Sequence, residues 1–218
     1  MSKLVTSCIF ILTMTAISFA QTTGKIAGSV SGATTELSST RLNVYVDHTY
    51  GFRVRYEGTL ALRGSDEYEI DLPASTKEAS MGSKVRIFVS QQPFVYLPGT
   101  YGGRYHFSGD RSGVTLSGRV AGDPVNVNGL EFARDYWAVY AGMGQWETVV
   151  NCYALYDGQY YIISLEHDFL TGMPGEIVNG SRTTKQQIRD NLINILRDTT
   201  NSYVKSFNEI LGSFSIAK

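Results

Sequence analysis

The chain has 218 residues, of which 43% are hydrophobic and 18% are charged, and its formal net charge is −1. That apolar content excludes a wholly disordered chain, and the nearly neutral charge gives no electrostatic footprint for nucleic acid or for an anionic membrane. The length suits a single domain.

The first 20 residues have the pattern of a Sec-type signal peptide. Lys3 precedes an apolar stretch from about Cys8 to Phe19, and Ala20 and the serine two positions before it are the small residues that signal peptidase prefers. The apolar stretch is interrupted by threonines and is shorter than the roughly 20 residues of a membrane-spanning helix. We therefore expect cleavage after Ala20, a periplasmic or secreted bacterial protein, and no membrane anchor after cleavage.

The cysteine content fits an exported protein that is stabilised by packing. Cys8 would leave with the signal peptide, so Cys152 would be the one cysteine of the mature chain and no intramolecular disulfide could form. Removal of Lys3 with the same segment would move the net charge from −1 to −2.

Residues 21–40 are rich in Gly, Ser and Thr and predict a flexible leader. Ordered structure is expected to begin near Arg41, which gives one domain over residues 41–218. We therefore look for all candidate functional residues within that range.

Two paired strands are predicted at the start of the domain. Leu42, Val44 and Val46 alternate with Asn43, Tyr45 and Asp47, the period of a half-buried strand. Residues 48–51 form a turn, and residues 52–56 alternate large apolar side chains with arginines in a second strand that pairs with the first.

The next predicted strands carry a run of carboxylates. Glu67, Glu69 and Asp71 alternate with apolar residues, and residues 84–90 form a further strand. Calcium takes six to eight oxygen ligands, but on a strand these carboxylates would lie roughly 6–7 Å apart at neighbouring positions. The glycine and the terminal glutamate of an EF-hand loop are also absent, so a solvated strand face is expected here.

Residues 91–129 have a different composition, with three of the five prolines and eight glycines. The glycines match neither G-x-G-x-x-G nor a P-loop, so phosphate binding is not indicated. A long irregular insert of this kind is often functional. Tyr101, Arg104, Tyr105 and His106 are our candidate binding residues, and a structural or flexible loop is the alternative.

A β-meander is predicted from Glu131 to Asp168. One strand covers residues 131–141, a turn follows at residues 142–144, and two strands flank Asp157-Gly158. Asp-Gly between apolar runs indicates a type I′ hairpin, because both central residues of that turn need positive φ.

The register of this hairpin decides whether its cysteine and histidine can react together. It places Cys152 opposite Ile163 and leaves His167 roughly 13 Å from Cys152 along the strands, whereas a nucleophile and its base must approach within about 3 Å. The apolar neighbours of Cys152 predict a buried thiol with a raised pKa. An approach of His48 or His106 to Cys152, from another part of the fold, stays an alternative.

No motif of an established catalytic class is present: the chain lacks H-E-x-x-H, G-x-S-x-G and C-x-x-C. With three separated histidines and one cysteine in the mature chain, a zinc site would need scattered ligands. We expect no catalytic residues, no metal and no cofactor.

The C-terminal part of the chain changes to a helical period. Thr183 and Gln186 resemble a capping box, and apolar residues recur at three- and four-residue steps from Ile188 to Leu211. This indicates one amphipathic helix, or two with a break near residues 200–201, and a last short strand at 213–216. The predicted fold class is α+β, an antiparallel sheet of about six to eight strands flanked by helices, with the long C-terminal helix packed on the sheet.

Three segments together resemble the PsbP-like fold family. They are the aromatic turn and strand YGFRVRY at residues 50–56, the meander through YALYDGQYYIISL at residues 153–165, and the ending ILGSF at residues 210–214. The family includes the PsbP subunits of photosystem II, the yeast Ran-binding protein Mog and many exported bacterial proteins. The resemblance, over residues 42–216, implies a sheet sandwiched by helices and a non-enzymatic accessory or docking module, and it brings no catalytic motif.

We therefore expect an exported, non-enzymatic accessory or binding protein that engages an envelope protein or a small apolar ligand through the insert. One alternative is an exported hydrolase whose site is assembled from distant residues, for which Cys152 and His106 are the candidates. Another is a purely structural component of the cell envelope.

Overall fold

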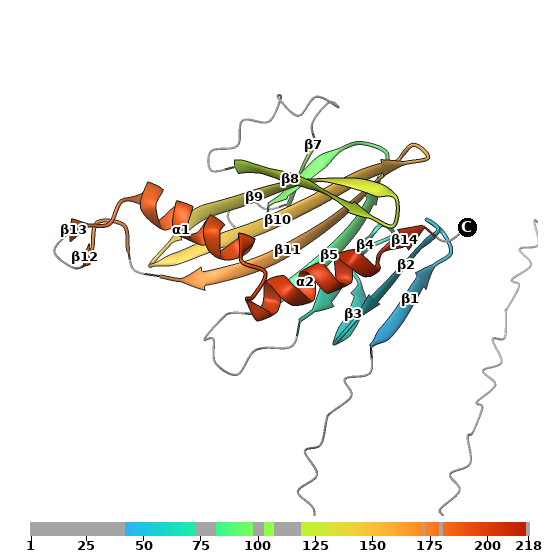
Figure 1. The fold of residues 1–218 in the computed structure, drawn as a ribbon, viewed down its shortest axis with the longest axis horizontal. Coiled ribbons are helices and arrows are strands. Elements are labelled where there is room, and N and C mark those ends of the chain that lie inside the picture. Colours follow the sequence, from blue (N-terminus) through green and yellow to red (C-terminus); the bar gives the residue numbers. More distant parts are fainter. Residues whose placement is uncertain are drawn as a thin grey trace, which may run out of the picture. The chain divides into compact units, whose positions relative to one another are not determined.

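The computed structural model describes residues 42–72, 82–97, 103–106, 119–171, 173–178 and 181–216 (Figure 1). The predicted signal peptide and leader lie outside these residues. None of the helices in the described part has the length and hydrophobicity needed to cross a membrane.

The fold is α+β, as predicted, and is built on antiparallel strands. Its strands are β1 (Asn43–Asp47), β2 (Phe52–Tyr56), β3 (Thr59–Leu62), β4 (Glu67–Asp71), β5 (Ser83–Ser90), β6 (Phe94–Leu97), β7 (Gly103–His106), β8 (Arg119–Val127), β9 (Leu130–Gly142), β10 (Gln145–Tyr156), β11 (Gln159–Leu170), β12 (Ile177–Val178), β13 (Ser181–Arg182) and β14 (Ser215–Ile216). A seven-stranded sheet has the order β3-β4-β5-β11-β10-β9-β8, and a three-stranded sheet has the order β1-β2-β14. The pairs β6-β7 and β12-β13 form two small sheets.

The central hairpin has the predicted register. Cys152 pairs with Ile163, and Thr148 pairs with His167. Asp157 and Gly158 both have positive φ, at 48° and 74°, as a type I′ turn requires. The separation of Cys152 from His167 along the strands is therefore confirmed.

The C-terminal segment forms two helices, α1 (Lys185–Arg197) and α2 (Ser202–Ser213). The capping box begins one residue later than predicted: Thr184 accepts a hydrogen bond from the Gln187 N–H, and the Gln187 side chain accepts one from the Thr184 N–H. The helix breaks after Arg197 because the Asp198 carboxylate takes the Thr200 N–H at 2.9 Å, a hydrogen bond that replaces continuation of the helix.

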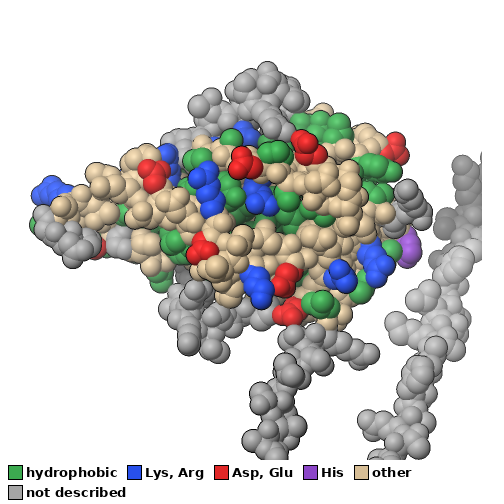
Figure 2. All heavy atoms as spheres, viewed as in Figure 1, with side chains coloured by type: hydrophobic (Ala, Val, Ile, Leu, Met, Phe, Trp, Pro, Cys, Tyr) green, Lys and Arg blue, Asp and Glu red, His purple; other side chains and the backbone are tan. Residues whose placement is uncertain are grey.

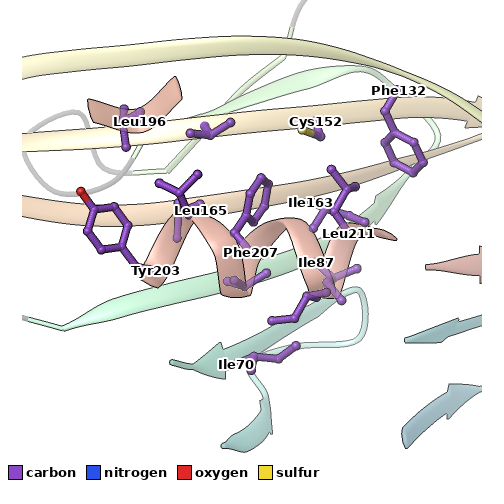
Figure 3. Packing of buried hydrophobic residues seen from close by; sticks show 14 of the residues in the cluster. Ile70, Ile87, Phe132, Cys152, Ile163, Leu165, Leu196, Tyr203, Phe207 and Leu211 are labelled. Atoms are coloured by element: carbon purple, nitrogen blue, oxygen red, sulfur yellow. The ribbon is translucent and has the colours of Figure 1, made fainter. Parts of the chain in front are cut away.

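The main core lies between the helices and one face of the large sheet. Figure 3 shows Phe207 of α2 directed toward the strand that carries Ile163 and Leu165. Tyr203, Phe207 and Leu211 belong with Cys152 and Leu165 to one cluster of buried side chains. The predicted position of the helices on the sheet is confirmed. Each fully buried side chain of this size contributes about 1.5–3 kcal/mol to stability.

The opposite face of the same sheet is also covered. Phe88, Trp137 and Ile162 are buried there, and Phe94 and Val95 of β6 pack against them. The central strand β10 is therefore buried on both faces, which explains its nearly continuous buried stretch from Trp146 to Ala154.

The prediction of an irregular segment over residues 91–129 is wrong, because β6, β7 and β8 lie within it. In β8 the glycine and proline belong to an irregularity of an edge strand, where the register shifts between Gly122 and Val125 around Pro124. Gly122 is needed there because a Cβ atom would lie 2.6 Å from Cε2 of Tyr136.

The solvated strand face predicted for β4 is wrong at Glu69, whereas Asp71 is exposed and Glu67 is partly exposed. Glu69 is only 2% exposed, and it forms ion pairs with Arg63, Lys84 and Arg86. Neighbouring strands supply these cations, so a pattern within β4 alone could not reveal them.

Candidate functional site

The structure places the predicted binding residues on a strand. Arg104, Tyr105 and His106 belong to β7, which pairs with β6 so that Tyr96 lies opposite Arg104. Tyr101 lies outside the described residues. A binding role for Tyr101, Arg104, Tyr105 and His106 stays a prediction.

The base of this hairpin is fixed to the sheet through Tyr96. Its hydroxyl donates to the Glu166 carboxylate at 3.1 Å, its carbonyl oxygen accepts from Asn151 Nδ2 at 3.3 Å, and the Arg86 guanidinium lies 5.2 Å from its ring centroid. Phe88 packs beside it, with ring centroids 5.0 Å apart. The insert therefore starts from a well-packed support.

Beneath Tyr96 a row of polar side chains crosses five strands of the large sheet. Pairing places side by side, in order across β4, β5, β11, β10 and β9, the residues Glu69, Arg86, Ser164, Asn151 and Asp135. Ser164 donates to Asn151 Oδ1 at 2.6 Å, and Arg119 forms an ion pair with Asp135 at 2.8 Å. The charged members of the row have partners, so this polar row is a satisfied network.

The pKa of Glu69 reflects the ion pairs that stabilise the polar row. Burial by itself would raise the pKa of Glu69, but the hydrogen bond from Arg63 and the positive charge of Arg86 together lower it below the usual value. Glu69 is therefore a carboxylate committed to ion pairing. A general base needs the opposite arrangement, a carboxylate free to accept a proton.

Cys152 lies among buried apolar side chains on the helix-facing side of the sheet, with Arg134 of β9 beside its thiol. It is fully buried (Figure 3), and burial raises its pKa to about 11. Strand β6, and with it the β6-β7 hairpin, packs on the other face of the sheet. The sheet thus separates the strand of His106 from the Cys152 thiol, whereas a catalytic pair must touch.

His167 has a structural environment of its own. Its Nδ1 lies 2.6 Å from the Ser83 hydroxyl, and its ring stacks on Tyr203 with centroids 3.9 Å apart. Burial lowers its pKa to about 4, so the ring is neutral near pH 7. Tyr203 and the neighbouring Phe169 shield the ring.

A further perturbed group is Asp168: burial and the nearby Glu166 and Glu147 raise its pKa to about 6. Raised carboxyl groups often mark functional sites, but here the neighbours are further acids. No group of three or more His, Cys, Asp or Glu side chains in the described ranges is arranged to hold a metal ion.

A surface that the sequence reasoning missed lies on the three-stranded sheet. The valines of β1 face outward, as does Leu42 directly before the strand: Leu42 and Val44 are 49% exposed, and Val46 is 38% exposed. Asp47 faces inward and is buried, where it accepts hydrogen bonds from the Tyr68 hydroxyl at 2.5 Å and from the Tyr50 N–H at 2.6 Å. The Asp47 side chain, anchored by the turn, decides which way β1 faces.

The same surface carries two arginines. Arg53 and Arg55 of β2 are exposed, and they pair with Val46 and Val44 respectively. We call the surface formed by Leu42, Val44, Val46, Arg53 and Arg55 the outer face. Figure 2 shows basic side chains beside hydrophobic ones over the end of the molecule where β1 and β2 lie in Figure 1.

The sequence pattern of β1 and β2 indicates this surface. Arg53 and Arg55 alternate with Phe52 and Val54, which are both fully buried. Residues paired across a hairpin share a face, so the turn at residues 48–51 already implied that Val44 and Val46 lie with the arginines.

A small cavity of about 220 Å³ adjoins the outer face. Leu42 and Arg55 belong both to its lining and to the outer face, and Leu72 and Ile210 add further apolar contacts. The cavity can accept a single apolar side chain next to the exposed valines.

Comparisons with known proteins found two kinds of result. No protein-family model matches the chain, and no curated protein matches its sequence. A crystal structure from Bacteroides thetaiotaomicron is similar at 8% identity and a TM-score of 0.41 over 80% of this chain, which spans about half (48%) of that protein's length. The solution structure of cyanobacterial PsbP (CyanoP) from Synechocystis sp. PCC 6803 is similar at 10% identity and a TM-score of 0.31, covering 85% of this chain and 98% of CyanoP. A PsbP structure is thus among those to which the chain is similar.

Proposed function

We propose that this chain is an exported, non-enzymatic accessory protein that binds a partner protein through the outer face, by adding an extended segment of the partner to the edge of β1. The observation that carries the proposal is the outward orientation of Val44 and Val46 on an edge strand, with the exposed Leu42 directly before it. Export rests on the signal-peptide pattern of residues 1–20.

The edge of β1 has the features of a strand that can receive another. In the described part of the chain it pairs with β2 on one side only, and it contains neither Lys nor Pro, the residues that commonly block such edges. The edge strand β8, by contrast, is interrupted by Pro124 and a register shift. Strand addition supplies main-chain hydrogen bonds, and the side chains give specificity.

The apolar side chains supply the driving force. Complete burial of such a side chain contributes about 1.5–3 kcal/mol, so covering Leu42, Val44 and Val46, which are roughly half exposed, offers about 1 kcal/mol each. The cavity beside Leu42 adds a place for an anchoring side chain of the partner.

The charges define the partner's chemistry. Arg53 and Arg55 are exposed, and no carboxylate among the described residues forms an ion pair with them. An extended segment whose outward-facing side chains, at every second position, include both apolar and acidic residues would cover the valines and reach the arginines on the same face.

The absence of catalysis is part of the proposal. It is supported by the burial of Cys152, by the neutral, stacked ring of His167 and by the ion pairs that occupy Glu69. These are the reactive groups that the described residues bring closest to a catalytic arrangement.

A peptide-binding experiment tests the proposal directly. A short peptide that carries valine and glutamate in turn at every second position, so that both lie on the outer face, should bind and shift the amide NMR signals of β1. The same peptide with lysine in place of glutamate should not. Arg53→Glu with Arg55→Glu should reverse this preference, since each exposed charge pair contributes up to about 1 kcal/mol, or about fivefold in affinity.

The matched control is Leu62→Ser, which removes an exposed apolar side chain from another edge strand, β3. It should leave peptide binding and capture of envelope proteins unchanged, whereas Val44→Ser with Val46→Ser should abolish both. Equal binding of the glutamate and lysine peptides, or capture that survives the valine changes, would contradict the proposal.

A further inference from the structure

An open groove of about 660 Å³ lies between α2 and the β8-β9 hairpin, at a place other than the outer face (Figure 1). Its volume falls within the range of about 300–1,000 Å³ that is typical of small-molecule sites. The polar part of its lining consists of Asn126, Asn128, Arg134, Thr199, Lys205, Asn208 and Glu209.

Arg134 is the central feature of the groove. It lies on β9 opposite Cys152, partly buried, where it interacts with the Cys152 thiol and with Tyr136. Its Nε is buried and has no hydrogen-bond partner among the described residues. No carboxylate in the described ranges forms an ion pair with it. A guanidinium is always charged and carries five donors, and leaving such a group buried without a counter-charge is costly.

The remaining charges in the groove leave it positive. Lys205 lies on its rim and approaches Glu209 at 3.9 Å, with both side chains more than half exposed. Such an exposed pair contributes little and opens easily. Glu209 is the one acid in the groove's lining, against Arg134 and Lys205.

The asparagine side chains that line the groove offer amide groups that can hydrogen-bond to the hydroxyl groups of a ligand. Asn126 Oδ1 accepts from the Gly129 N–H at 3.2 Å, which leaves the NH₂ group of Asn126 for a ligand. Asn128 Nδ2 donates to the Phe214 carbonyl at 2.6 Å and fixes the hairpin turn against the end of α2. The groove is therefore bounded by elements that are tied together, with Asn208 and Thr199 on its helical side.

We propose that this groove binds a small hydroxylated anion, a sugar acid or a sugar phosphate. The anionic group would pair with Arg134, Lys205 would add a second charge, and the asparagine amides would take the hydroxyls. The inference does not depend on the partner-binding proposal, since the groove contains none of the five outer-face residues, although it shares Glu209 and Gly212 with the cavity beside Leu42.

The proposed ligand class is tested with four probes: glucuronate, glucose 6-phosphate, glucose and inorganic phosphate. Binding of each is measured by calorimetry and by the NMR signal of the Arg134 Nε–H. Glucuronate or glucose 6-phosphate should bind and shift that signal, and the better of the two identifies the anionic group. Neutral glucose should not bind, and inorganic phosphate should bind more weakly than the sugar anion.

Arg134→Lys, which keeps the charge but removes the planar fork, should weaken binding about tenfold or more. Lys205→Gln should weaken it a few-fold, and Arg182→Gln, an exposed change elsewhere, should not alter it. If Arg134→Lys does not fold, Lys205→Gln combined with Asn208→Ala serves as the test. Glucose binding as tightly as glucuronate, full affinity in the groove variants, or no shift of the Arg134 signal at ~10 mM probe, a weak-affinity limit, would overturn the inference.

Discussion

Replacing Glu69 with glutamine should destabilise the fold by about 2 kcal/mol. Removing one partner of a buried ion pair costs about 3–5 kcal/mol when a buried charge is left uncompensated. Here Arg63 and Lys84 are 52% and 37% exposed, so water can solvate them. Arg86 is only 15% exposed, but it keeps Glu67 at 2.8 Å and Glu166 at 3.0 Å. The cost therefore falls below the full range.

The same residue predicts a pH dependence. Because the pKa of Glu69 is lowered in the folded state, folding is stabilised above the unfolded-state pKa of about 4.3, and that contribution is lost as the pH falls through the folded-state pKa. Glu69→Gln removes the contribution, so the stabilities of the variant and the wild type should converge toward acid pH.

Urea denaturation followed by circular dichroism, at neutral pH and at a series of acidic pH values, measures both effects. Glu209→Gln is the matched control, because Glu209 is 59% exposed and its ion pair is long at 3.9 Å, and it should change stability by less than about 0.5 kcal/mol. A Glu69→Gln variant as stable as the control, or a stability difference that does not shrink on acidification, would refute the reasoning about the polar row.

Three further predictions concern single residues. Cys152, with its pKa raised to about 11, should react with a thiol reagent at pH 8 only at the rate of unfolding, so labelling that is fast and insensitive to denaturant would contradict its burial. His167, with its pKa lowered to about 4, is neutral when folded. Stability should therefore fall as the pH drops from the unfolded value of about 6.5 toward 4, and acid titration of His167→Phe should lack this step. Gly122→Ala should lower the melting temperature, since the new Cβ would lie 2.6 Å from Tyr136; in a Tyr136→Ala background the added cost should largely disappear.

The parts of the fold that could be predicted from the sequence are those encoded by neighbouring residues. The Asp157-Gly158 turn fixed the register of β10 and β11, and the helical period located α1 and α2. Both signals act within a few residues, so no knowledge of distant partners was needed.

The orientation of β1 and the strands of the insert depend on distant contacts. The alternation in β1 taken alone is compatible with either face; pairing with β2 puts Val44 and Val46 on the face of the arginines, and the hydrogen bond from Tyr68 to Asp47, across 21 positions of sequence, holds the opposite face against the core. Strand β8 forms despite its Gly-Asp-Pro sequence because β9 supplies the partner edge. For Tyr101 and the other predicted binding residues, sequence could suggest a role through composition but not a geometry.

The polar row shows why the candidate binding surfaces were the hardest part to predict. Its five members come from five strands, and only the combined register of four strand pairs aligns them. Read singly, Glu69 and Asp135 look like solvated residues and Asn151 like a turn residue. Together they form the buried support on which Tyr96 and the start of the insert rest, whereas Val44 and Val46, which look like core residues when read singly, are exposed. A surface that a partner can use is thus defined by what the other strands leave uncovered, and this property belongs to the assembled sheet.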